Sequence, residues 1–168
     1  IAELGINHKG DLSIAKDLVA EVSWIGEDSS RADPSYLIDA FTLATAEGAN
    51  FVTYADTVGY ALPEEIGKII KSIVKSIDSK TIVGIHCHND LGLAVANSLS
   101  AISSGAKEVQ CTIAGIGERA GNTALEEVIM SLKVRKDSLD AYTEVDSRLL
   151  SDICEMVSKF SNSPIAKN

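Results

Sequence analysis

The chain is poor in cysteine, in basic residues and in long apolar runs, and each shortage excludes a class of protein. Its three cysteines contain no CxxC pair, so we expect no disulfide framework, and their odd number favours a reducing compartment. Lys and Arg total 15 against 24 Asp and Glu, a net charge of −9, which argues against a nucleic-acid partner because phosphate binding needs a basic face. No apolar run reaches the length of a membrane span and no signal peptide opens the sequence, so we expect a cytoplasmic protein with no membrane partner.

Strand-like and helix-like segments alternate along the 168 residues at a spacing of roughly 25–30 residues. This alternation is typical of α/β proteins built from βα units around a parallel sheet. We predict strands at residues 1–6, 22–25, 51–55, 81–86 and 108–113, and helices at residues 11–21, 34–47, 63–77, 92–104, 122–134 and 147–160.

The polar, glycine-rich stretches follow strands, as the active-site loops of a TIM barrel do. A closed barrel of that type has eight strands, so about five predict a partial TIM-barrel-like (βα) repeat. We therefore expect one incomplete barrel domain over residues 1–168. The second strand follows the first helix with almost no loop, which places a junction near residues 20–22.

The most informative stretch is GIHCHND, residues 84–90, at the end of a predicted strand. Residues two apart on a strand point to the same face, so His86 and His88 direct their imidazoles to one side and Cys87 points to the other. A single buried histidine is usually a core residue with satisfied hydrogen bonds. Two neutral imidazoles side by side at a strand end are half of a divalent-metal site.

A second glycine-rich stretch, GIGERAGN at residues 115–122, follows a strand and precedes a helix. Its backbone N–H groups are placed to hold an anion, although its glycines do not form a dinucleotide-binding fingerprint. Asn122 has an alternative role as the helix N-cap. Glu118 and Arg119 have an alternative as a solvated pair.

Two further loops carry polar groups after strands. In ADTVGY, residues 55–60, Asp56 and Thr57 are either active-site groups or turn residues that bond their own backbone. Glu27 and Asp28 either touch a metal or substrate or face water.

Taken in order, these motifs resemble the family of 2-isopropylmalate, homocitrate and citramalate synthases. The resemblance covers about residues 22–168 and rests on ED-x-x-R-x-DP at 27–34, ADTVGY at 55–60, GIHCHNDLGLAVAN at 84–97 and GIGERAGN-x-x-LEEV at 115–128. It implies a metal-dependent TIM-barrel acyltransferase, of the kind used in leucine biosynthesis, that condenses acetyl-CoA with a 2-oxo acid in a Claisen condensation.

The resemblance also implies roles for individual residues. Glu27 would be catalytic, in proton transfer, and Thr57 and Glu118 would lie at the 2-oxo acid beside the metal. The sequence leaves Mg²⁺, Mn²⁺ and Zn²⁺ open as the metal. The implied metal ligands are His86, His88 and Asn122.

The chain also departs from that family. It lacks the D-x-x-x-R-D-G type motif of the family's opening strand, whose Asp is a metal ligand, and its first 20 residues instead resemble N-acetylneuraminate (sialic acid) synthases. Ile25 and Ala114 stand where the family often has Ser and Asn. Two alternatives follow, a non-catalytic metal-binding remnant and a phosphoenolpyruvate-dependent condensing enzyme. A partial barrel also has two open sheet edges, which predicts a homo-oligomer.

Overall fold

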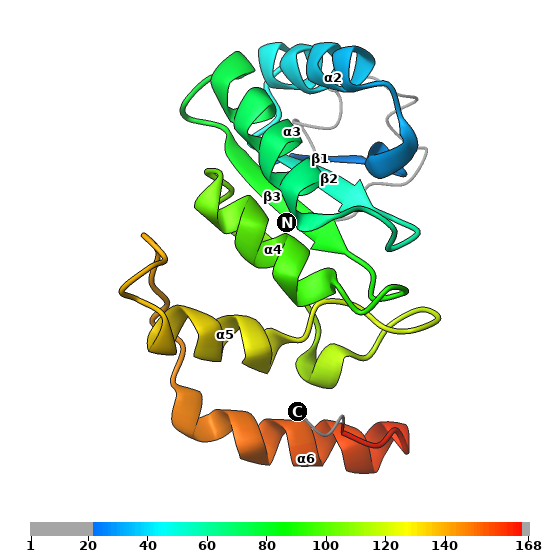
Figure 1. The fold of residues 1–168 in the computed structure, drawn as a ribbon, viewed down its shortest axis with the longest axis vertical. Helices are drawn as coiled ribbons and strands as arrows, with labels where there is room; N and C mark the ends of the chain where they lie inside the picture. Colours follow the sequence, from blue (N-terminus) through cyan, green and yellow to red (C-terminus); the bar gives the residue numbers. More distant parts are fainter. Residues whose placement is uncertain (1–21, 166–168) are drawn as a thin grey trace.

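The computed structural model describes residues 22–165 of the chain. Four parallel strands form one sheet in the order β1-β2-β3-β4, which confirms an α/β fold with the strand pattern of a partial TIM barrel (Figure 1). The predicted strand at residues 1–6 and helix at residues 11–21 lie outside the described residues. The strands are β1 (Ser23–Gly26), β2 (Phe51–Asp56), β3 (Ile82–Cys87) and β4 (Glu108–Gln110).

The helices follow the strands and begin at residues that favour helix starts. Pro34 opens α2 behind Asp33, whose carboxylate accepts hydrogen bonds from the backbone N–H groups of Ser35 and Tyr36. Pro63 opens α3, and the Glu65 carboxylate caps the Leu62 N–H at 2.9 Å. The helices are α2 (Pro34–Ala46), α3 (Pro63–Ser76), α4 (Ala94–Ser103), α5 (Leu125–Val134) and α6 (Leu150–Ser161), and the short 3₁₀ turns are η2 (Ser29–Arg31), η3 (Ile113–Gly115) and η4 (Ser147–Leu149).

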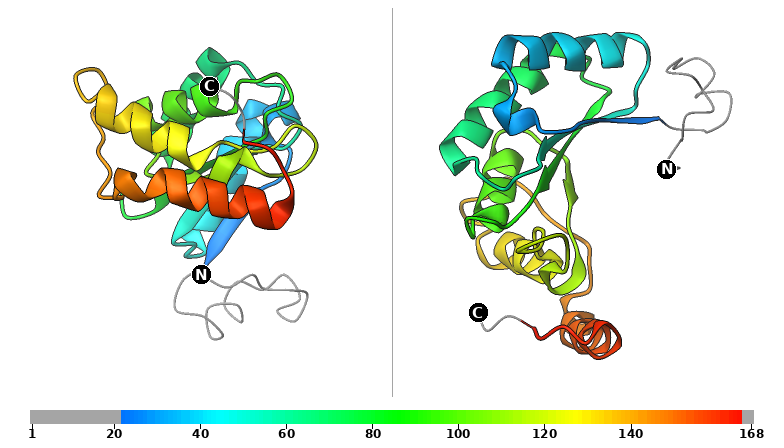
Figure 2. Two further views of the ribbon diagram at one scale, coloured as in Figure 1. Left: turned by 90° about the horizontal axis from the view of Figure 1, so that it is seen from below. Right: turned by 90° about the vertical axis from the view of Figure 1, so that its right-hand side faces the viewer.

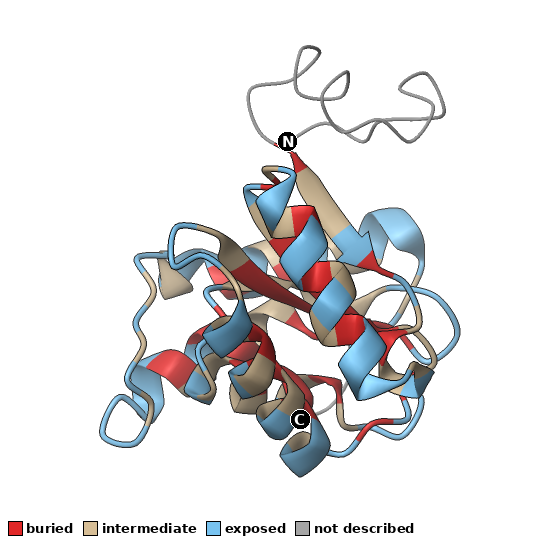
Figure 3. Cartoon of the chain, turned by 90° about the horizontal axis from the view of Figure 1, so that it is seen from above, coloured by how far each residue is buried: buried red, intermediate tan, exposed pale blue. Residues whose placement is uncertain are grey.

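The core lies between one face of the sheet and helices α2, α3 and α4, and buried residues concentrate along this contact (Figure 3). Trp24 packs edge-on against the fully buried Phe41, with ring centroids 5.0 Å apart. The strand residues on this face alternate with residues on the other. The main core side chains are Leu37, Phe41, Val52, Tyr54, Ile66, Ile70, Ile73, Val83, Ile85 and Cys87.

The opposite face of the sheet carries the residues between these core positions. Thr53 and His86 lie on it, and the Gln110 side chain bridges from β4 to the Thr53 hydroxyl at 3.5 Å. Because all four strands are parallel, their carboxyl ends lie at the same edge, and the loops that follow them meet there. This edge is where the candidate site residues are expected.

The bounds of β4 and α5 differ most clearly from the prediction near the site. Strand β4 stops at Gln110 rather than 113, and α5 begins at Leu125 rather than 122. The reason is backbone pairing between distant segments. Thr112 donates to the Thr123 carbonyl and accepts from Leu125, while Thr123 donates to the Cys87 carbonyl. Residues 122–124 are therefore extended, and Asn122 is not the N-cap of α5, which is Ala124.

Helix α6 lies at the end of the fold away from α2, beside α5 (Figure 2). Its first predicted turn, residues 147–149, is the separate 3₁₀ turn η4. Leu150 and Cys154 are buried, whereas Met156 and Phe160 are exposed. Among residues 22–165, no helix is both long enough and apolar enough to span a membrane.

Candidate metal centre

His86 and His88 bring their rings together at the carboxyl end of β3. Their Nε2 atoms are 3.0 Å apart and their ring centroids 5.0 Å apart. Cys87, between them, is fully buried in the core on the other face. Burial, and then the neighbouring His88, lower the pKa of His86 below its ordinary value, which favours the neutral ring that a metal ion requires.

Asn122 reaches the same point from the loop before α5. A backbone bridge pairs Asn122 with His88, and the Asn122 Nδ2 atom lies 3.1 Å from the His86 Nε2 atom. Turning the carboxamide over exchanges Nδ2 with Oδ1, so the amide oxygen can take the same place. Gly117 lies against this amide, and a Cβ at residue 117 would overlap the Asn122 Oδ1 atom.

These three side chains fit the requirements of a divalent ion. An octahedral ion with ligands at about 2.1 Å has neighbouring ligand atoms roughly 3.0 Å apart, which matches the 3.0 and 3.1 Å separations around His86. Two imidazoles and one amide oxygen are ligands that first-row divalent metals accept. Within residues 22–165 no group of three or more His, Cys, Asp or Glu side chains is placed to hold a metal, so no acidic ligand joins the set there.

The sequence assigns Arg119 no role in the site beyond its place in the GIGERAGN loop, because a solvated pair with Glu118 accounts for it. Its Nε and Nη2 atoms donate to the two oxygens of Asp90 at 2.8 and 2.9 Å. Nη2 also donates to the Thr57 backbone carbonyl at 2.7 Å and lies 2.9 Å from the His88 Nδ1 atom. One guanidinium therefore joins the loops after β2 and β3 to the loop that carries Asn122.

A close approach of two loops supports this arrangement. Gly59 has φ +62°, and a Cβ at residue 59 would lie 2.6 Å from the Asp90 Oδ2 atom and 2.8 Å from the His88 carbonyl oxygen. Only glycine meets both requirements, the left-handed backbone and the missing side chain. The loop after β2 therefore lies directly against the loop that carries the second histidine.

Thr57, the predicted substrate residue, lies on the loop after β2, the strand beside β3, and Glu27, the predicted proton-transfer residue, lies on the loop after β1, one strand farther from the histidines. The Thr57 hydroxyl oxygen accepts from the Asp28 N–H at 2.8 Å, which ties the loop after β1 to the loop after β2. The Glu27 side chain is exposed and makes no hydrogen bond within the described residues. Asp28 forms an ion pair with Arg31 at 2.6 Å, so its carboxylate has a partner within the loop after β1.

Asp56 and Glu118 have clearer assignments. Asp56 is fully buried and accepts from the backbone N–H groups of Tyr60 and Ala61, so its turn role is confirmed. Glu118 is exposed and lies 3.3 Å from Arg119. Its negative charge raises the pKa of His86, but burial and the neighbouring His88 lower that pKa by more.

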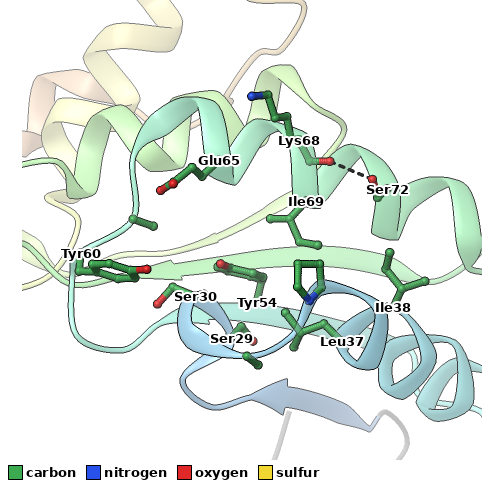
Figure 4. A pocket seen from close by; sticks show the side chains of 13 residues that line it. Ser29, Ser30, Leu37, Ile38, Tyr54, Tyr60, Glu65, Lys68, Ile69 and Ser72 are labelled. Carbon is green, nitrogen blue, oxygen red and sulfur yellow. Dashed lines mark hydrogen bonds between the residues drawn. The ribbon is translucent and has the colours of Figure 1, made fainter.

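A separate cavity of 370 Å³ lies between α2 and α3, on the helical side of the sheet (Figure 4). Tyr54, Tyr60 and Ser30 direct their hydroxyls into it, and Leu37, Ile38 and Ile69 form its apolar wall. None of the predicted site residues lines this cavity. The candidate metal ligands therefore lie at the strand ends and not in this cavity.

A sequence model of the HMGL-like family matches residues 8–157. The chain belongs to the HMGL-like family. Among its relatives in this family, a 2-isopropylmalate synthase of Aquifex aeolicus is 43% identical over 163 residues, which are 95% of this chain and 31% of that protein. A 2-isopropylmalate synthase of a Geobacillus species is 49% identical over 134 residues, 78% of this chain and 26% of that protein. This HMGL-like chain thus spans about a third of the length of the relatives it matches.

Solved structures support the fold of this HMGL-like chain. A hydroxymethylglutaryl-CoA lyase from Pseudomonas aeruginosa superposes with a TM-score of 0.78 at 20% identity, over 94% of this chain and 55% of that one. The N-terminal domain of a putative aldolase from Bacteroides vulgatus gives a TM-score of 0.73 at 24% identity, over 93% of this chain and 51% of that one. The described part of the chain therefore has the fold of roughly half of such a lyase.

Proposed function

We propose that this chain carries the metal-binding and oxo-acid-binding part of an acyltransferase of 2-isopropylmalate synthase type, which condenses acetyl-CoA with a 2-oxo acid. The observation that supports the proposal is the convergence of His86, His88 and Asn122 at the carboxyl end of β3, within 3.0 and 3.1 Å of the His86 Nε2 atom. It occurs in a chain that is 43% identical to a 2-isopropylmalate synthase over 95% of its length.

The reaction forms one carbon–carbon bond and breaks one thioester. A methyl proton of acetyl-CoA passes to a base, the methyl carbon bonds to the keto carbon of the 2-oxo acid, and water cleaves the thioester to release the CoA thiol. A divalent ion held at the metal centre would supply Lewis acidity to the 2-oxo acid. His86, His88 and the amide of Asn122 would hold that ion, with Mg²⁺, Mn²⁺ and Zn²⁺ as candidates.

Thr57 and Glu27 have distinct roles in this proposal. The Thr57 oxygen already accepts from the Asp28 N–H, which leaves its O–H proton free to donate to a carboxylate oxygen of the 2-oxo acid. The exposed Glu27 carboxylate, on the adjacent loop, is free of competing hydrogen bonds within the described residues and serves as the group that moves a proton. Glu118 contributes negative charge beside the metal and the substrate.

The test is release of free thiol from acetyl-CoA, followed with a thiol reagent. The full chain is incubated with Mg²⁺, Mn²⁺ or Zn²⁺ and with 2-oxo acids of different side-chain length. We expect thiol release that depends on both the metal and the 2-oxo acid, and its loss in a His88→Ala variant. Arg148→Lys, which alters an exposed ion pair with Asp146 on another part of the surface, is the matched control. No release with any of these acids and metals would refute the proposal.

A second candidate, metal binding without turnover, is favoured by one observation. Residues 22–165 supply two histidines and an amide to the centre but no acidic ligand. Calorimetry that detects stoichiometric metal binding in a chain that releases no thiol would select this candidate. The phosphoenolpyruvate-dependent alternative rests on the first 20 residues, which lie outside the described part, and phosphate release in the presence of an amino sugar would test it.

A homo-oligomer is part of the same proposal. Within the described residues, β1 and β4 each pair on one side only, so the sheet has two open edges. Sedimentation at several protein concentrations tests it. A monomer at every concentration would contradict it.

A further inference from the structure

We infer that Arg119 is a positioning residue, whose guanidinium fixes the loops after β2 and β3 relative to the loop that carries Asn122. The inference rests on the proposed function for what the site binds, and on the contacts of the Arg119 side chain for how this residue acts. The site needs three loops that are far apart in the sequence to be held in place, and a functional constellation tolerates displacements of only about 0.5 Å. Arg119 is 62 residues from Thr57 and 29 from Asp90.

The guanidinium is suited to this task because its donors form a rigid, planar fork. Its Nε and Nη2 atoms donate to the two carboxylate oxygens of Asp90, and Nη2 also donates to the Thr57 carbonyl. Asp90 is two residues after His88, and Arg119 is three residues before Asn122. A displacement of either loop therefore moves a candidate metal ligand. A lysine has the same charge but no fork, so it cannot hold the two loops in one geometry.

The backbone of Arg119 indicates that this placement is demanding. Its φ is +55°, a left-handed conformation that non-glycine residues rarely adopt. Such conformations persist where the surroundings determine them, and here the side chain makes contacts with Asp90, Thr57, His88 and Glu118. The Arg119 side chain is 43% exposed and that of Asp90 28%, so the ion pair itself adds little to global stability. Its effect is expected on the geometry of the site.

The experiment compares Arg119→Lys with Arg31→Lys in the full chain. Arg31 is the matched control because it makes the same two-nitrogen contact with an aspartate, Asp28, in the loop after β1, but its side chain makes no other hydrogen bond within residues 22–165. Mn²⁺ binding is followed by the electron paramagnetic resonance of free Mn²⁺. We expect Arg119→Lys to weaken Mn²⁺ binding about 10-fold or more, with an unfolding temperature close to that of the wild type. Arg31→Lys should change neither quantity.

A second measurement separates this inference from the proposed function. In the metal-free chain, hydrogen exchange of the Asn89 backbone amide, which donates to the Gly121 carbonyl at 2.9 Å, reports how firmly the loop after β3 is held against the loop that carries Asn122. Arg119→Lys should speed this exchange severalfold, whether or not the chain binds a metal. If the wild type binds no Mn²⁺, the metal proposal fails and this exchange rate alone decides the inference. An unchanged exchange rate, full retention of Mn²⁺ affinity where the wild type binds the ion, or equal changes in Arg119→Lys and Arg31→Lys, would overturn it.

Discussion

The substitution Gly117→Ala provides a sharp test of the metal centre because it adds one methyl group beside a single candidate ligand. A Cβ at residue 117 would overlap the Asn122 Oδ1 atom, and would lie 2.6 Å from the Asn122 Cγ and 3.1 Å from its backbone nitrogen. Gly117 is not among the glycines with positive φ, so its backbone accepts alanine without strain. The methyl group must therefore displace the Asn122 side chain.

The expected cost follows from losing one of three ligands. Loss of a group that merely supports a metal ligand typically lowers metal affinity by about 10- to 100-fold, so displacement of a ligand should cost at least as much, and a 10-fold loss is about 1.4 kcal/mol of binding free energy. Mn²⁺ titration of Gly117→Ala should show a loss at least this large. Gly67→Ala, in α3, is the control, because its added Cβ would meet only the hydroxyl tips of Ser100 and Ser104, at 2.9 and 3.1 Å, and these can turn aside.

A double-mutant cycle identifies the cause of the loss. In an Asn122→Ala background the atoms that the new methyl group would overlap are absent, so Gly117→Ala should weaken Mn²⁺ binding little further. Wild-type affinity in the single variant Gly117→Ala would refute the placement of Asn122. An undiminished effect in the Asn122→Ala background would refute the steric explanation.

Three further predictions concern the core and the histidine pair. Phe41→Ala should lower the free energy of unfolding by about 3–5 kcal/mol, measured by urea denaturation, because Phe41 is fully buried against Trp24, and a loss below 1 kcal/mol would contradict this packing. Cys87 should resist alkylation by iodoacetamide at pH 8 in the folded chain, because burial and then the charge of Asp56 raise the pKa of its thiol to about 12. Mass spectrometry measures the alkylation, and rapid alkylation of Cys87 in the folded chain would contradict the prediction. Burial holds the pKa of His86 below its ordinary value of 6.5, so the unfolded chain binds a proton at this ring more readily than the folded chain does. The metal-free protein should therefore lose stability as the pH falls below about 6.5. If the free energy of unfolding changes equally in the wild type and in His86→Gln between about pH 7.5 and 5.5, the lowered pKa is contradicted.

The parts of the fold that depend on local pattern were predictable. Apolar runs identified β2 and β3, and Pro34 and Pro63 marked the starts of α2 and α3 within a residue or so. The sequence predicts a start of α5 at residue 122, three residues before its actual start at Leu125. Residues 122–124 are extended. Their backbone instead pairs with Thr112, Cys87 and His88, and no local pattern reports such pairing.

The same distinction applies to the site. The i, i+2 spacing of His86 and His88 determines that both rings leave one face of a strand, so their proximity could be predicted from the sequence. Arg119 could not be identified in the same way, because its neighbour Glu118 already supplies an ordinary surface partner. Its function depends on contacts with Thr57 and Asp90, which only the folded chain brings together.

The glycines that surround the site have a consequence for mutational screens of this chain. Gly59 and Gly117 have no side chain to contribute to chemistry, yet a methyl group at either position would collide with atoms of Asp90, His88 or Asn122. A saturation screen scored by activity would therefore rank both glycines beside the histidines. Intolerance to substitution at these positions reflects how closely the loops are packed. Catalytic residues should therefore be identified from such a screen only after the positions that fail for steric reasons have been set aside.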